Sequence, residues 1–157
     1  MISFDQHGNI PPGIHQYTYL EFRQQFVEEF PTSNTRTEIH QLSFLWLGEV
    51  RRYIQPVEVW VNGGFISNEL NPPLIEMCLF IHPYALDEKK SYECLQLLNN
   101  AMSYRSRCYF GFRNSEKPLV SLAIGPYYWT EQLGFDAQQI PKGIVLLPWD
   151  EITAALD

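Results

Sequence analysis

The sequence has little cysteine, which argues against protein classes that depend on disulfide bonds or on clustered thiolates. Its 157 residues include three cysteines, Cys78, Cys94 and Cys108. The number is odd, and no two of them show the Cys-x-x-Cys spacing of a zinc or redox site. A secreted domain built on disulfides is therefore disfavoured, and we expect buried free thiols.

Positive charge is also scarce. The chain carries 11 Lys and Arg residues against 18 Asp and Glu residues, which gives a net charge of -7 at pH 7. This balance argues against broad binding to nucleic acids or membrane surfaces. We therefore expect the protein to contact nucleic acid only indirectly, through a protein partner. Arg105, Arg107 and Arg113 remain a candidate basic patch, or alternatively the solvated edges of a strand pair.

No long hydrophobic run occurs in the chain. The longest strongly apolar stretch, residues 74–81, is interrupted by Glu76 and is far too short to cross a bilayer. The first residues show neither a basic start nor an apolar segment. The sequence therefore predicts no membrane span, no secretion signal and a cytoplasmic location.

Hydrophobic residues are nevertheless plentiful. They make up 45% of the chain and include 10 Phe, 9 Tyr and 4 Trp, which excludes disorder of the whole chain. We expect one domain over residues 1–157. Its first part, about residues 1–17, contains Pro11 and Pro12 and should form an extended arm.

Hydrophobic spacing predicts an α+β fold. Thr18 and Glu21 form a capping-box pattern at the start of a helix that should end before Pro31. Further helices are expected from the polar cluster 32–34 to residue 53, from Asp87 to near Asn100, and over residues 128–133. In the helix after Asp87, one face carries Tyr92, Leu95, Leu98 and Met102.

Short apolar runs predict the strands. They are expected at residues 57–61, 74–81, 107–112, 119–124 and 143–147, with a hairpin loop at 114–118. The order of the elements predicts a mixed β-sheet with helices packed mainly on one face.

The most informative segment lies between Trp60 and Met77. It reads Trp-Val-Asn-Gly-Gly-Phe-Ile-Ser over residues 60–67 and Asn-Pro-Pro-Leu-Ile-Glu-Met over residues 71–77. Here the chain resembles the minimal nucleotidyltransferase superfamily with its polymerase-beta-like core, and more closely a little-characterised bacterial family of that group. In that family a strand runs into Gly-Ser, a short loop ends in Pro, and the next strand carries Asp-x-Asp. The arm at residues 8–15 and the tail at residues 128–144 extend the resemblance over nearly the whole chain.

The resemblance implies a site in which two carboxylates, two residues apart on a strand, hold divalent metal beside a nucleoside triphosphate. In this chain Leu74 and Glu76 occupy those positions, and Gly64 stands where the serine is expected. A third carboxylate is expected on a following strand, and residues 107–112 contain none. The sequence therefore predicts a catalytically impaired protein.

The candidate site residues follow from the same segment. Glu76 is the residual candidate for catalysis and for metal binding, or alternatively a structural carboxylate at a strand end. Gly63, Gly64 and Ser67 are candidates for binding a nucleotide or phosphate. For the two glycines the alternative is a tight turn that needs unusual backbone angles.

Three functions remain open from the sequence. The leading one is a nucleotidyltransferase-like protein without catalysis that binds a protein partner. The resemblance implies that the protein is the antitoxin or regulatory component of a bacterial toxin–antitoxin or phage-defence system. The partner is then a toxin or effector. The second is an active nucleotidyltransferase that uses Mg²⁺, a nucleoside triphosphate and Glu76 together with Glu69 or Asp87. The third is a nucleotide sensor without catalysis; apart from the second function, no cofactor is expected.

Several other residues are weaker candidates. His82 follows a predicted strand and lies either near the site's rim or simply at the surface, while His7, His15 and His40 lack metal-ligand spacing. The cluster Tyr127-Tyr128-Trp129 either stacks a base, fills a partner's pocket or packs on the sheet.

Overall fold

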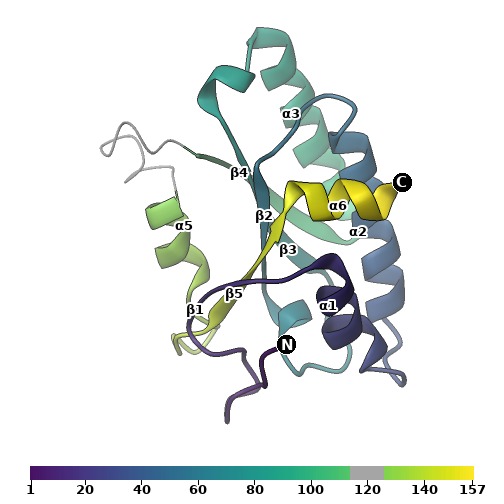
Figure 1. The fold of residues 1–157 in the computed structure, drawn as a ribbon, viewed down its shortest axis with the longest axis vertical. Helices are drawn as coiled ribbons and strands as arrows, with labels where there is room; N and C mark the ends of the chain where they lie inside the picture. Colours follow the sequence, from purple (N-terminus) through teal and green to yellow (C-terminus); the bar gives the residue numbers. More distant parts are fainter. Residues whose placement is uncertain (114–125) are drawn as a thin grey trace.

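The computed structural model describes residues 1–113 and 126–157, without the side chains of residues 126–128 and 131. Five strands form one mixed sheet in the order β1-β5-β2-β3-β4 (Figure 1). The strands are β1 Gly13–Gln16, β2 Glu58–Asn62, β3 Ile75–Ile81, β4 Ser106–Phe112 and β5 Gly143–Pro148. The helices are α1 Tyr19–Arg23, α2 Arg36–Val50, α3 Glu88–Asn100, α5 Pro126–Leu133 and α6 Trp149–Leu156. The predicted α+β class with a mixed sheet is confirmed.

The strand pairing places distant parts of the chain side by side. β2 lies between β3 and β5 and is antiparallel to both, while β1 runs parallel to β5 and β4 runs parallel to β3. In this register Glu76 on β3 is opposite Asn62 on β2 and Arg107 on β4. Three residues from three strands therefore meet at one end of the sheet.

The two faces of the sheet are covered unequally. One face packs against α1, α2, α3 and α6, which bury Phe22, Trp46, Leu97 and Ile152 among other side chains. The opposite face carries a smaller cluster of Trp60, Cys78, Phe80, Leu133 and Ile144, of which Leu133 belongs to α5. Figure 1 shows α5 on the other side of the sheet from the remaining helices. The prediction of helices mainly on one face is confirmed.

Local signals set the starts of two helices. The Thr18 side chain accepts from the N–H of Glu21, and the Glu21 carboxylate accepts from the N–H of Thr18, which completes the expected capping box. α1 continues as a π-helical turn, Gln24–Glu28, and so ends before Pro31 as predicted. Asp87 caps α3 by accepting from the N–H of Lys90.

The apolar face predicted for α3 does not face the core. Tyr92 and Leu95 are 61% and 58% exposed and Leu98 is half-buried, whereas Cys94 and Leu97 are buried. Met102, 56% exposed, lies in the 3-10 turn after the helix. The hydrophobic spacing correctly predicted a helix in this segment. The face turned toward the sheet, however, is set by how α3 packs rather than by where its largest apolar side chains lie.

Other departures are small. β3 begins at Ile75, so Leu74 lies just outside the strand, and residues 13–16 of the arm form the edge strand β1. α6 was not predicted, because its eight residues follow β5 without a break. The strand predicted at 119–124 and the hairpin loop at 114–118 lie outside the described residues.

The three cysteines are free thiols, with Cys78 and Cys94 buried and Cys108 partly buried, as expected. Burial raises the pKa of all three thiols. Across the described ranges, no helix combines the length and the hydrophobicity needed to cross a membrane.

Candidate functional site

The glycine turn begins where β2 ends. β2 is buried along its whole length and leads into Gly63, whose φ of 83° lies in the left-handed region. A Cβ on Gly63 would also lie 3.3 Å from the carboxyl carbon of Glu76. Both facts explain the glycine at position 63.

Gly64 has a different reason to be small. Its φ is not in the left-handed region, and a Cβ there would collide with the carboxylate of Glu69. The Glu69 side chain is exposed, so it can move. Among the described residues, no acceptor is found for the N–H groups of Gly64 and Phe65.

A buried arginine holds the loop after this turn. Arg36 is fully buried at the start of α2 and donates to the backbone carbonyls of Phe26, Phe65 and Ser67 at 2.8, 2.6 and 2.9 Å. It also donates to the carbonyl of Glu69. Burial lowers the pKa of Arg36 to about 10, although Glu69 acts in the opposite direction. The sequence analysis missed Arg36, because an arginine at a helix start is usually exposed.

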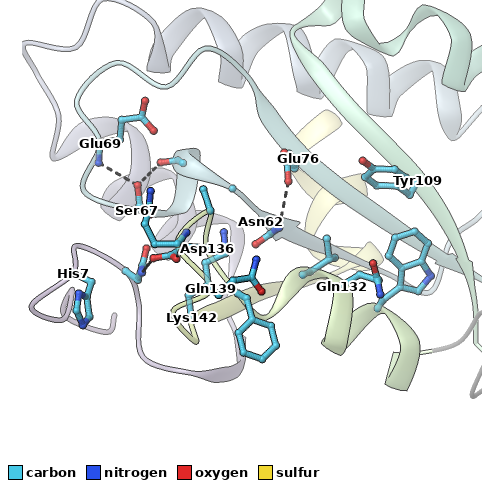
Figure 2. Close-up of a pocket in the computed structure, with 18 residues that line it drawn as sticks. His7, Asn62, Ser67, Glu69, Glu76, Tyr109, Gln132, Asp136, Gln139 and Lys142 are labelled. Carbon is cyan, nitrogen blue, oxygen red and sulfur yellow. Dashed lines mark hydrogen bonds between the residues drawn. The ribbon is translucent and has the colours of Figure 1, made fainter.

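The turn opens onto a pocket of about 940 Å³. Gly63, Gly64, Ser67 and Glu76, the four residues that the sequence analysis proposed, all line it. In Figure 2, Asn62 and Glu76 lie between Ser67 and Glu69 on one side and Tyr109 on the other. The structure thus brings the sequence candidates together in one cavity.

Both oxygens of the Glu76 carboxylate are engaged. Oε1 accepts from Nη1 of Arg107 at 3.0 Å, and Oε2 accepts from Nδ2 of Asn62 at 3.3 Å. Asn62 is 5% exposed, and its Oδ1 is buried without a hydrogen-bond partner in the described part of the chain. An unsatisfied buried acceptor costs about 1–3 kcal/mol, so it is uncommon outside functional or strained regions.

The three arginines of the candidate basic patch are each paired with a carboxylate. Arg105 contacts Glu38 at 3.4 Å, Arg107 contacts Glu76 at 3.0 Å and Arg113 contacts Glu58 at 2.9 Å. Their charges are largely compensated, which favours the alternative interpretation of these arginines as strand-edge residues.

The residues present do not fit a pair of divalent metal ions. Leu74 has no ligand atom in its side chain, and the only carboxylate on β3 is already bound by Arg107 and Asn62. Asp87 caps α3 beyond the opposite end of β3, outside the pocket, whereas Glu69 does line it. Within residues 1–113 and 126–157, no group of three His, Cys, Asp or Glu residues is placed to hold a metal.

Lys142 is a pocket residue that the sequence analysis missed. It is partly buried, and its ammonium group forms no ion pair or hydrogen bond with any described residue. Burial lowers the pKa of Lys142, while Glu76 and Asp136 act to raise it. The only hint in the sequence was its place in the tail segment 141–144 that contributed to the family resemblance.

The N-terminal arm and the segment before β5 form one rim of the pocket. Asp136 accepts from Nδ2 of Asn9 at 3.0 Å and from the N–H groups of Gln138 and Ile140 at 2.9 Å each. These bonds lower the pKa of Asp136, with the Ile140 N–H the largest cause. Asn9 also pairs through its backbone with Ser67. The arm, the glycine loop and the segment before β5 therefore meet at this rim.

Aromatic side chains form the other end of the pocket. The rings of Tyr109 on β4 and Trp129 on α5 are 5.2 Å apart, and both residues line the cavity. Trp129 also lies close to Gly111 on the sheet, so it packs on the sheet and faces the pocket at once. The side chains of Tyr127 and Tyr128 are outside the described part of the structure.

The remaining histidines do not form a site together. His7 lines the pocket rim, whereas His15 contacts the Pro11 carbonyl and His40 lies among Tyr19 and Phe44. His82 stacks on Tyr84 at 4.9 Å and does not line the pocket, which agrees with the surface interpretation.

Comparison with known proteins gives a family without an assigned activity. No curated protein and no solved structure matches the chain. A family model described as a family of unknown function, DUF6932, matches residues 2–148, so the chain belongs to that family.

Proposed function

We propose that this protein binds a nucleotide in the pocket without transferring it, on a nucleotidyltransferase-like scaffold. The observation that carries the proposal is the composition of the cavity. It joins a glycine turn, Ser67 and the ammonium of Lys142, which no described residue pairs, beside a carboxylate that Arg107 already neutralises.

The two ends of the pocket suit the two ends of a nucleotide. The N–H group of Gly64 and the ammonium of Lys142 provide donors for phosphate oxygens. Tyr109 and Trp129 provide aromatic surface for a base. The Glu69 carboxylate, which lies next to Gly64, has to turn into solvent when the phosphate enters.

We infer that the protein does not transfer the nucleotide, because the Glu76 carboxylate is already engaged by other residues. A nucleotidyl transfer needs several oxygen ligands for metal, whereas Glu76 is a single carboxylate and each of its oxygens already accepts a hydrogen bond. An active enzyme using Glu76 and Glu69 is the weaker alternative; Asp87 is not placed to assist.

The direct test is calorimetry of the purified protein with ATP, GTP, CTP and UTP in turn, each in the presence of Mg²⁺. We expect saturable binding of at least one of them. Lys142→Met should weaken it by about tenfold, because a charge-assisted hydrogen bond is lost. Lys89→Met removes an exposed lysine of α3, away from the pocket, and serves as the matched control.

Two results would contradict the proposal. One is the absence of binding with all four nucleotides. The other is transfer of label from a nucleotide to RNA or protein that Glu76→Gln abolishes, since this would make the protein an active enzyme.

A second proposal concerns a protein partner, and the exposed apolar face of α3 favours it. Tyr92 and Leu95 are more than half exposed on this helix, and so is Met102 in the 3-10 turn that follows it. Clustered exposed apolar residues are typical of interaction surfaces. In line with the family resemblance, we propose that a toxin or effector docks on this face.

Purification from the native host tests the partner. We expect a stoichiometric partner with the wild-type protein and its loss with Leu95→Asp, while the melting temperature of the protein stays the same. Leu45→Asp, on the exposed side of α2, is a control with a similar exposure. Retention of the partner by the Leu95 variant would exclude this face.

A further inference from the structure

Arg107 belongs to the strand on which the family resemblance leads us to expect a carboxylate. The resemblance places a third acidic residue on a strand that follows the Asp-x-Asp strand. In the structure β4 runs parallel to β3, and its residue in register with Glu76 is Arg107. The sign of the charge at this place in the sheet is thus the opposite of the one a metal site needs.

The resulting ion pair makes a divalent cation unnecessary for charge balance. Arg107 Nη1 lies 3.0 Å from Glu76 Oε1, and the Glu76 side chain is 23% exposed. A guanidinium keeps its charge at every physiological pH, so Glu76 is neutralised permanently rather than only when metal is present. Asn62 donates to the second oxygen at 3.3 Å, so each carboxylate oxygen already accepts a hydrogen bond.

With Glu76 paired to Arg107, Lys142 is the cation available to bind an anionic ligand. Of the described residues that line the pocket, Lys142 is the only lysine or arginine. Its ammonium has no partner there, while the nearby Asp136 is satisfied by Asn9, Gln138 and Ile140. A partly buried cation without a partner is well placed to form a charge-assisted hydrogen bond with a phosphate group.

We propose that the pocket binds its phosphate-bearing ligand without a divalent cation, with Arg107 as the permanent counter-charge of Glu76 and Lys142 as the cation that contacts the ligand. This inference rests on the proposed nucleotide binding. It adds that Arg107 balances the charge of Glu76, so that no divalent cation is needed there.

The test is calorimetry of ATP, GTP, CTP and UTP with the full-length protein, first in excess EDTA and then in excess MgCl₂. We expect the nucleotide that binds to do so at least as tightly in EDTA as in MgCl₂. Arg107→Met should weaken binding in EDTA by about tenfold, because Glu76 then repels the phosphates. Addition of MgCl₂ should recover part of that loss.

A double variant separates charge from folding. Glu76→Gln combined with Arg107→Met removes both charges, and we expect it to recover in EDTA most of the affinity that Arg107→Met alone loses. Arg52→Met removes an exposed ion pair with Glu49 and is the matched control. If Arg107→Met fails to fold, as judged by its melting curve, the double variant and the wild-type comparison still decide the question.

The outcomes are distinct. Wild-type binding that is lost in EDTA and restored by MgCl₂ would overturn this inference and leave the proposed nucleotide binding intact. Failure of the double variant to bind, with a normal melting curve, would overturn the role of Arg107 as a counter-charge. No binding in either buffer would overturn the proposed function and this inference with it.

Discussion

Trp60 is the clearest single residue on which to test the packing. It is 1% exposed on β2, and its ring lies 4.5 Å from that of Phe80, centroid to centroid. Its Nε1–H donates to Glu58 Oε1 at 3.2 Å. Trp60→Ala should lower the free energy of unfolding by about 3–5 kcal/mol, because it leaves a large cavity under α5. Urea denaturation followed by circular dichroism measures this loss.

The control at the residue scale is a large apolar residue that is not buried. Leu95→Ala, on the exposed face of α3, should change the free energy of unfolding by less than about 0.5 kcal/mol. Equal losses for the two variants would mean that α5 does not cover Trp60 in solution.

At the scale of elements, the two glycines of the turn between β2 and β3 should respond differently to substitution by alanine. Gly63→Ala should lower the free energy of unfolding by about 1–2 kcal/mol, because alanine at a φ of 83° is strained. Its methyl group would also press on Glu76 and weaken nucleotide binding. Chemical denaturation and calorimetry of the same variant measure both effects.

Gly64→Ala is the matched control for this turn. Its φ is outside the left-handed region, and only the exposed side chain of Glu69 has to move. We expect a stability close to that of the wild type. A larger loss at Gly64 than at Gly63 would mean that the backbone of the turn differs from the one described.

For the whole molecule, stability should fall as the pH is lowered below about 6.5. His40 lies between Tyr19 and Phe44, and burial, followed by the charge of Arg23, lowers its pKa to about 4. The unfolded chain then binds more protons than the folded one between these two values. The contribution of His40 is therefore complete above pH 6.5 and is lost as the pH falls toward 4.

Urea denaturation at a series of pH values from about 7 to 4 measures this dependence. His40→Gln should flatten the curve over that window by up to about 3 kcal/mol. Glu21 and Asp136 have lowered pKa values through their hydrogen bonds, so the decrease that they cause belongs to more acidic pH and should persist in the variant. An unchanged curve in His40→Gln would show that His40 is not the titrating group.

Features that depend on residues close together in the chain were predictable from the sequence, whereas contacts between distant segments were not. The capping box at Thr18, the cap at Asp87 and the glycine turn after β2 were all predictable, because each depends on residues close together in the chain. Four site residues were predicted for the same reason: Gly63, Gly64, Ser67 and Glu76 belong to one strand–turn–strand segment.

The sequence by itself thus determined the α+β class, most element positions and one side of the pocket. The tertiary structure alone decided the rest. The register of β3 and β4, which are joined through α3, brings Arg107 to Glu76. The position of β5 between β1 and β2 brings Lys142 and Asp136 to the arm. Spacing in the sequence does not encode such pairings, because the packing of helices and strands across the whole core sets them.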